Sequence, residues 1–184
     1  MNDANRSDDA RADLELIDAW RAGDERAASL LVGRHASAVA RFLASCGARR
    51  DVDELVQDTF VRAFGAIDSF RADSSLRTWL FTIARRLLLD QRRSDGRRRD
   101  RVEISEGDAI TEFDALDGVV ADETQQQLRA AMDRLSPKQK EVFTLRVTEG
   151  LTYRDIADVV GTTEGAARVH YYNAVRTIKE FLDD

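Results

Sequence analysis

The chain has little of three residue types that stabilise or interrupt the folds of many small proteins. Its 184 residues include one cysteine, one proline and two histidines. A single cysteine excludes an intrachain disulfide and leaves a cysteine-based zinc site without enough ligands. The near absence of proline leaves long stretches free of helix breakers. We therefore predict an all-α fold in a reducing compartment, with no metal site and no cofactor.

The sequence also lacks long apolar runs and catalytic motifs. No stretch of about 18 consecutive apolar residues occurs, and residues 1–24 are acidic and polar rather than basic and then apolar. Motifs of the HExxH, Walker and nucleophile-elbow types are absent, His35 and His170 lie far apart in the sequence, and Cys46 has no evident base. We predict a cytoplasmic protein that does not insert into membranes and is not an enzyme.

Acidic and basic residues are segregated along the chain, although the net charge is only −6. Residues 71–101 contain ten arginines and four acids, whereas residues 102–124 contain eight acids and no base. Because the guanidinium fork matches phosphate oxygens, the basic block is typical of a surface that binds a polyanion. The alternative is a solvated helix end followed by a tether.

This pattern predicts two small helical domains joined by an acidic flexible linker, because the acidic block shows no sustained helical period. We expect a disordered acidic N-terminal extension at residues 1–12. The first domain then covers residues 13–98, the linker residues 99–126, and the second domain residues 127–184.

In the first domain, residues 51–64 predict a helix whose early acids suit a helix N-terminus. Its apolar residues recur at i, i+4, i+5 and i+8 and form a stripe that we expect to be buried. The opposite face is polar, which suits either a basic partner or simple solvation. That face, which we call the acidic face, consists of Asp53, Glu54, Gln57, Asp58 and Arg62.

A polar turn at residues 70–75 leads into a second helix that begins at Leu76, and either Ser74 or Ser75 can cap it. Aromatic rings beside arginines suit single-stranded nucleic acid, because bases stack on rings while guanidinium groups pair with phosphates. We expect Phe81 in the core, whereas Trp79 fits either a core or a base-stacking position. The residues predicted to contact nucleic acid are Phe70, Arg71, Ser74, Ser75, Arg77, Trp79, Arg85, Arg86, Arg92 and Arg93.

In the second domain, helix-capping signals predict three helices. Ser136, Pro137 and Gln139 give a capping box with proline at the first helical position, and this helix is expected to end at Gly150. Residues 152–155 repeat the capping pattern and open a short helix that stops at Gly161. A third helix follows and is expected to hold Ala167, Tyr171, Ala174, Ile178 and either Phe181 or Leu182 against the core.

Two helices joined by a glycine turn, the second with a free polar face, are typical of a helix-turn-helix that reads DNA. A plain helical hairpin for protein contact is the alternative. Side chains near the start of the last helix would reach base edges, and those further along would reach phosphates. The predicted DNA contacts are Thr163, Glu164, Arg168, Val169, Tyr172 and Arg176.

Three segments together resemble the bacterial sigma factors of the extracytoplasmic-function (ECF) class, group 4 of the sigma-70 family. They are DVDELVQDTFVRAF at 51–64, FRADSSLRTWLFTIARRLLLDQRR at 70–93, and LSPKQKEVFTLRVTEGLTYRDIADVVGTTEGAARVHYYNAVRTIKEFL at 135–182. The order and spacing of the three segments agree with this family, whose minimal members contain only sigma regions 2 and 4. The resemblance implies a region 2 helical bundle followed by a region 4 helix-turn-helix.

The resemblance also implies partners and roles. The acidic face is expected to dock on the β′ clamp helices of core RNA polymerase, which also contacts such factors through its β subunit. Residues 69–75 and the following arginines would capture the melted strand of the minus-10 element, and the last helix would read the minus-35 element as duplex. An anti-sigma factor is expected to cover these surfaces. Because residues 167–172 depart from the usual family residues, the promoter sequence does not transfer.

A rival interpretation is a two-domain helix-turn-helix regulator that binds duplex operator DNA without polymerase. It predicts tight binding by the isolated protein, usually to a palindromic site matched to a dimer. The sigma factor interpretation predicts feeble binding by the isolated protein and promoter melting only with core polymerase.

Overall fold

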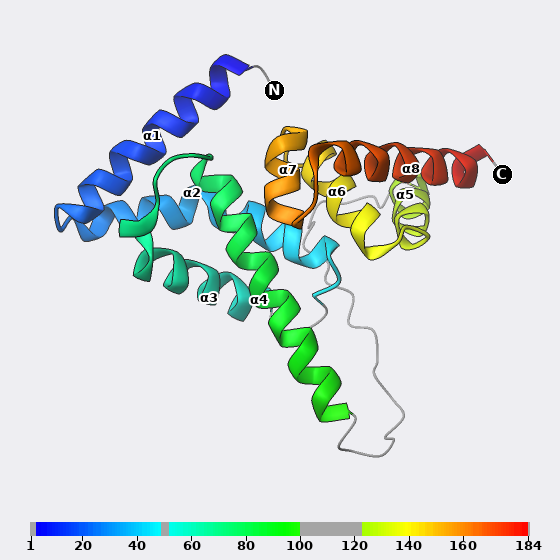
Figure 1. Cartoon of the computed structure of the whole chain (residues 1–184), viewed down its shortest axis with the longest axis horizontal. Coiled ribbons are helices and arrows are strands. Elements are labelled where there is room, and N and C mark those ends of the chain that lie inside the picture. The colour runs from blue at the N-terminus through cyan, green and yellow to red at the C-terminus, as the bar shows by residue number, and fades with distance from the viewer. Residues whose placement is uncertain (1–2, 49–51, 100–122, 184) are drawn as a thin grey trace. The chain divides into compact units, whose positions relative to one another are not determined.

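The computed structural model describes residues 3–48, 52–99 and 123–183, all of whose regular elements are helices (Figure 1). The predicted all-α fold is confirmed. None of the described helices is long and apolar enough to cross a membrane. The elements are α1 (Asp3–Arg21), α2 (Glu25–Ser45), α3 (Val52–Gly65), the 3₁₀ turn η1 (Ile67–Ser69), α4 (Leu76–Arg99), α5 (Glu123–Asp133), α6 (Pro137–Val147), α7 (Tyr153–Val160) and α8 (Glu164–Asp183).

The chain divides into two compact units, which we call the first and the second unit. The first comprises Met1–Leu43 and Asp51–Ala109, and the second Ala44–Arg50 and Ile110–Asp184. Helix α5 begins at Glu123, so its first turn falls in the stretch 99–126 predicted as linker. Most of that predicted linker, residues 100–122, lies outside the described residues.

The core of the first unit is built from the apolar stripes that the sequence predicts. Phe42 of α2 meets Phe81 of α4 with ring centroids 5.1 Å apart, and Trp20 of α1 meets Phe64 of α3 at 5.2 Å. Phe81 is fully buried, so its predicted core position is confirmed. The buried face of α4 also includes Leu76, Leu80, Ala84, Leu87 and Leu88.

The predicted disorder of residues 1–12 is wrong for residues 3–12, which form the first part of α1. This segment is tied to α2, because the Arg34 guanidinium bonds to the Asp9 and Asp13 carboxylates at 3.2 and 2.9 Å. Helix α2 runs through Gly33 without a break.

The second unit confirms the predicted caps. Ser136 and Gln139 form the capping box of α6, Thr152 and Asp155 that of α7, and Gly161 ends α7 in the left-handed conformation. Helix α6 ends at Val147 rather than at Gly150, which has φ +67° two residues beyond the C-cap Thr148.

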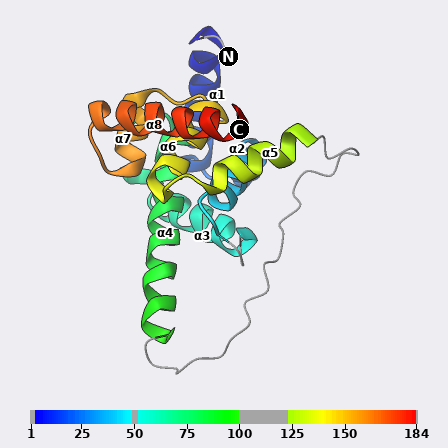
Figure 2. The ribbon, with the colours of Figure 1, turned by 90° about the vertical axis from the view of Figure 1, so that its right-hand side faces the viewer.

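Helix α8 contacts α5, α6 and α7, and Figure 2 shows this arrangement from the side. Ala131 and Leu135 form a buried cluster with Ala174 and Ile178 of α8, and Phe181 packs against it. Leu182 is 48% exposed, so of the two predicted alternatives Phe181 is the core residue.

Candidate protein and nucleic-acid interfaces

The acidic face of α3 lies opposite the buried stripe of that helix, as predicted. Leu55, Thr59, Phe60 and Ala63 are buried, whereas all five residues of the acidic face are exposed. The carboxylates of Asp53 and Glu54 stand in the first turn, where the helix dipole favours negative charge.

One apolar residue on this face was missed by the sequence reasoning. Val61 is 63% exposed and lies one helical turn after Gln57, among the polar side chains. Val61 gives this otherwise polar face one small apolar contact point. The sequence contains a signal for it. Of the positions from 57 to 62 that fall on the polar face of the helical repeat, only position 61 holds an apolar residue.

The turn at residues 70–75 joins η1 to α4, and its serines have different roles. The Ser75 hydroxyl accepts a hydrogen bond from the Thr78 amide at 3.1 Å, so Ser75 rather than Ser74 caps α4. Arg71 and Ser75 are exposed and Ser74 is half-buried.

Phe70 does not present its ring to solvent. It is only 9% exposed and packs against Trp79 with ring centroids 5.1 Å apart. Hydrophobic burial holds the ring inside this unit, and the contact of Phe70 with nucleic acid stays a prediction. Trp79 is half-buried, and its ring packs against Phe70. This favours the core position over the base-stacking position for Trp79.

Ala72 within this turn has φ +58° and is the one described residue other than glycine with a positive φ. A left-handed conformation costs an alanine about 1–2 kcal/mol. Backbone strain of this kind concentrates at functional turns, where the surroundings hold it in place.

We expect Ala72→Gly to stabilise the first unit by about 1 kcal/mol, because glycine adopts a positive φ without a Cβ clash. The protein has two tryptophans, Trp20 and Trp79, and both lie in the first unit. Tryptophan fluorescence during urea unfolding therefore measures that unit alone. The control Ala36→Gly, inside α2, should destabilise it by about 1 kcal/mol. Equal losses for both variants would contradict the role assigned to the backbone of Ala72.

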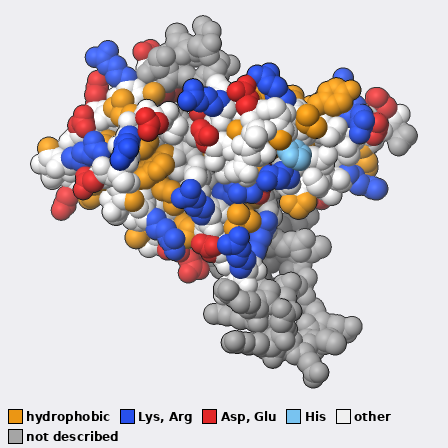
Figure 3. All heavy atoms as spheres, in the orientation of Figure 1, with side chains coloured by type: hydrophobic (Ala, Val, Ile, Leu, Met, Phe, Trp, Pro, Cys, Tyr) orange, Lys and Arg blue, Asp and Glu red, His pale blue; other side chains and the backbone are white. Residues whose placement is uncertain are grey.

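Four arginines of α4 lie on two lines along the helix. Arg86 and Arg93 are seven residues apart and exposed, and Arg85 and Arg92 form a second line beside them. Arg93 is 3.5 Å from Asp90, and the Arg77 guanidinium lies over the Phe81 ring at 5.7 Å. Figure 3 shows Lys and Arg side chains gathered over α3 and α4. Arg85, Arg86, Arg92 and Arg93 thus share a surface that suits a phosphate backbone, whereas half-buried Arg77 lies on the other side of the helix from Arg86 and Arg93.

Helix α8 presents the predicted free face. Val169 is 58% and Tyr172 68% exposed, and Glu164, Arg168 and Arg176 are exposed beside them. Thr163 caps the helix by accepting a bond from the Ala166 amide at 3.2 Å, so its hydroxyl has a structural role.

Arg168 is held in place by two neighbours that the sequence reasoning did not connect. Its guanidinium is 2.6 Å from the Glu164 carboxylate and 4.7 Å from the ring centroid of Tyr153, and Arg146 approaches the same ring at 4.7 Å. The i,i+4 pair with Glu164 was visible in the sequence, but the contact with Tyr153 of α7 depends on the crossing of the two helices.

Arg21 is the other residue that the sequence reasoning missed. It ends α1, and its Nη2 donates to the carbonyl oxygens of Ile67 at 2.8 Å and Phe70 at 3.4 Å. Arg21 is 46 positions from Ile67 and 49 positions from Phe70 along the chain, so no local sequence pattern indicates either contact.

Comparison with known proteins gives two consecutive family matches. Residues 31–98 match the model of sigma-70 region 2, and residues 125–178 match that of sigma-70, region 4. The ECF RNA polymerase sigma factor BldN of Streptomyces coelicolor is 33% identical over 184 residues, covering 97% of this chain and 68% of the relative. The ECF RNA polymerase sigma-E factor of Haemophilus influenzae is 30% identical over 176 residues, covering 91% and 93%.

Two solved structures are similar in fold and sequence. The sigma factor RpoE in complex with the anti-sigma factor NepR from Bartonella quintana gives a TM-score of 0.66 at 29% identity and covers 84% of this chain and 96% of its own. CnrH in complex with the cytosolic domain of CnrY gives 0.65 at 27% identity, covering 94% and 97%.

Proposed function

Because this chain belongs to the ECF class of the sigma-70 family of RNA polymerase sigma factors, we propose that its surfaces bind core polymerase and open a two-element promoter. The observation that supports this most is the presence of an acidic α3 face, an arginine-lined α4 and a capped helix-turn-helix in one chain, in the order of regions 2 and 4. No feature of the described residues favours the rival operator-binding regulator over this function. The protein would act in the cytoplasm and without catalytic activity of its own.

The acidic face of α3 is the proposed contact with the β′ clamp helices. Exposed carboxylates of Asp53, Glu54 and Asp58 attract a basic partner, while Val61 among them gives the contact an apolar centre. We expect the exposed charges on this face to direct the association of the protein with core polymerase, and Val61 to slow its dissociation.

The turn at 70–75 and the arginines of α4 are the proposed contact with the minus-10 element. Opening a duplex costs about 1.4 kcal/mol per base-pair step. Capturing one or two unstacked bases recovers about 1–3 kcal/mol each. These amounts are too small to open a whole bubble, so polymerase has to supply the remainder.

The exposed face of α8 is the proposed reader of the minus-35 element as duplex DNA. A helix of this kind fits the major groove, where each base pair presents a distinct pattern of polar and methyl groups. Arg168, held by Glu164 and Tyr153, enters the groove with its orientation already limited.

An anti-sigma factor is the proposed regulator. The similar structures with RpoE and CnrH were solved with NepR and the cytosolic domain of CnrY, respectively. A protein that covers the acidic face of α3 or the arginines of α4 would prevent both proposed contacts.

Transcription in vitro tests the proposed function. Core polymerase is supplied with a library of promoter fragments, with and without the protein. We expect start-site selection only when both are present, and weak DNA binding by the protein alone. Tight binding to a palindromic duplex by the isolated protein, without any gain in transcription, would instead support the regulator.

The exposed apolar residues of α8 lead to a prediction about base preference. Thymine carries the apolar group of the major groove, its 5-methyl, so Val169 and Tyr172 should lie against thymines. Replacing one contacted thymine by deoxyuridine should weaken holoenzyme binding about fourfold, the value of one buried methyl group at about 0.8 kcal/mol.

Val169→Ala should weaken binding to the thymine duplex and should not weaken binding to the deoxyuridine duplex. Leu182→Ala, which removes another exposed apolar side chain from α8, serves as the control and should change neither. Equal effects of Val169→Ala on both duplexes would contradict a methyl contact.

A further inference from the structure

Arg21 connects the end of α1 to the segment that leads into the proposed minus-10 turn. Its Nη2 donates to the Ile67 and Phe70 carbonyl oxygens, and its Nε lies 3.7 Å from the Asp68 carboxylate. Its Nη1 is 3.4 Å from Asp18 on its own helix. A guanidinium group can serve all these acceptors at once because its donors point in fixed, diverging directions.

Besides Arg21, the segment is held by the backbone bonds of η1, in which the Phe70 amide donates to the Ile67 carbonyl at 3.1 Å, and by packing from one side. The side chains of Ile67 and Phe70 are buried at 4% and 9% exposure, whereas Asp68, Ser69 and Arg71 are exposed. Packing therefore holds the inner side of the segment, and the Arg21 bonds hold two of its carbonyl groups. Phe70 is followed directly by Arg71 and then by the strained Ala72.

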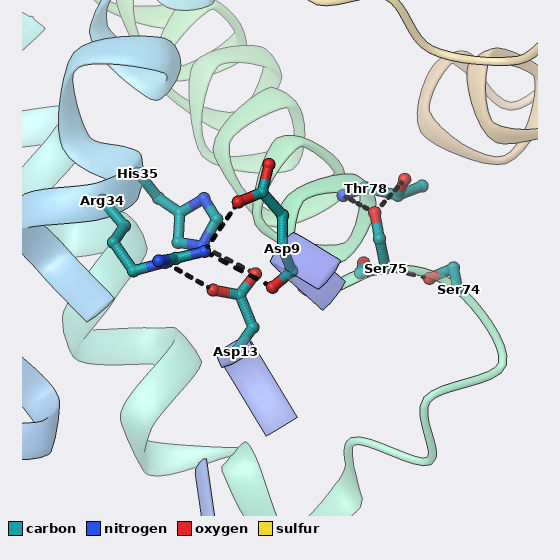
Figure 4. Close-up of polar contacts among 7 residues, drawn as sticks. All are labelled: Asp9, Asp13, Arg34, His35, Ser74, Ser75 and Thr78. Carbon is teal, nitrogen blue, oxygen red and sulfur yellow. Dashed lines mark hydrogen bonds and ion pairs between the residues drawn. The ribbon is translucent and has the colours of Figure 1, made fainter. Parts of the chain in front are cut away.

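Helix α1 itself is anchored, so Arg21 acts from a fixed position. Figure 4 shows Asp9 and Asp13 of α1 pointing toward Arg34 and His35 of α2. Asp13 is 3% exposed, and its carboxylate lies 2.9 Å from both Arg34 Nε and His35 Nε2. With the packing of Trp20 on Phe64, these bonds place the end of α1 beside η1.

We propose that Arg21 is a positioning residue for promoter opening, which keeps the turn at 70–75 in its strand-capturing conformation before DNA arrives. This inference rests on the proposed function of that turn. A segment that is ordered in advance loses less conformational entropy on binding, so the contact raises the affinity for single-stranded DNA without touching it. Helix α1, predicted from the sequence to be partly a disordered extension, thereby belongs to the DNA-capturing unit.

The experiment compares Arg21→Met, which keeps much of the length of the side chain and removes every donor, with Arg21→Lys, which keeps the charge and one donor group. Both variants are assembled with core polymerase. Binding of a fluorescent single-stranded minus-10 oligonucleotide and opening of a duplex promoter are then measured. We expect Arg21→Met to lose about 10-fold in both, and Arg21→Lys to lose about threefold, since it serves one carbonyl instead of two.

Arg11→Met is the matched control, because Arg11 is an exposed arginine of the same helix that pairs with Glu15. It should match the unmodified protein in every measurement. Affinity for core polymerase should stay unchanged in all three variants, and urea unfolding followed by tryptophan fluorescence verifies that the first unit is folded. A structural collapse would lower polymerase affinity and oligonucleotide binding together, whereas a positioning role lowers only the second.

Two outcomes overturn the proposal. One is wild-type oligonucleotide binding and opening by folded Arg21→Met. The other is wild-type opening by Arg21→Lys if Arg21→Met proves unfolded. Failure of the proposed function is a different result, because the unmodified holoenzyme would then open no promoter and bind no minus-10 oligonucleotide.

Discussion

Reversing the charges of Asp53 and Glu54 to lysine is expected to lower the affinity for core polymerase by at least about 100-fold. Both carboxylates are exposed at the start of α3, so their reversal turns attraction to a basic partner into repulsion across the whole contact. Such a loss corresponds to about 2.7 kcal/mol of binding free energy. Pull-down with tagged core polymerase measures it, and circular dichroism verifies the helical content.

The control for this variant has to carry the same kind of cost to the stability of a helix. Lysine in a first turn opposes the helix dipole by about 0.3–1 kcal/mol per residue. Glu25→Lys carries the cost of one of these two replacements in the first turn of α2, away from the acidic face. If Glu25→Lys reduced polymerase binding as strongly as the α3 variant, the acidic face would not be the docking surface.

Replacing Arg85, Arg86 and Arg92 together by alanine is expected to weaken promoter opening about 10- to 100-fold at physiological salt. Each side chain is expected to supply about 0.5–1 kcal/mol through a partly solvated phosphate contact. Opening by the unmodified holoenzyme should fall steeply with salt, since each phosphate neutralised on a single strand releases counterions. Losing three contacts should lower the logarithmic salt slope by about 2.

A fluorescent base analogue in the minus-10 element measures this opening across a salt series. Alanine at Arg11, Arg26 and Arg129, three exposed arginines outside α4, removes the same charge and should leave the slope unchanged. Normal melting by the α4 variant would place the strand elsewhere. An equal change of slope in both triple variants would indicate a general charge effect rather than a phosphate path along α4.

Local rules explain why much of the fold could be predicted from the sequence. Capping boxes at Ser136 and Thr152, the left-handed glycine at Gly161 and the buried stripe of α3 each depend on residues within a few positions of one another. The errors occurred where a tertiary contact overrides the local pattern. Residues 3–12 are polar and acidic, yet they form a helix because Arg34 of α2 binds Asp9 and Asp13.

The candidate interfaces could be predicted from the sequence to a similar extent. Exposed arginines on α4 and polar residues on α8 follow from helical periodicity and charge, so the chemistry of both proposed nucleic-acid surfaces could be predicted from the sequence. The roles within the turn at 70–75 were not, because Phe70 is buried against Trp79 while Ser75 caps α4. Burial of one aromatic residue in a polar turn depends on which helix lies behind it.

The sequence by itself determined most of the helices and caps, the segregation of charge and the family, since all of these are encoded in spacings of one to eleven residues or in the order of motifs. Only the tertiary structure decided that Arg21 contacts the carbonyl groups of Ile67 and Phe70, and that Tyr153 lies against Arg168. Such contacts join residues whose separation along the chain carries no periodic signal. They form because packing of the apolar stripes brings the helices together, and the polar groups at the helix ends then pair with whatever that packing places within reach.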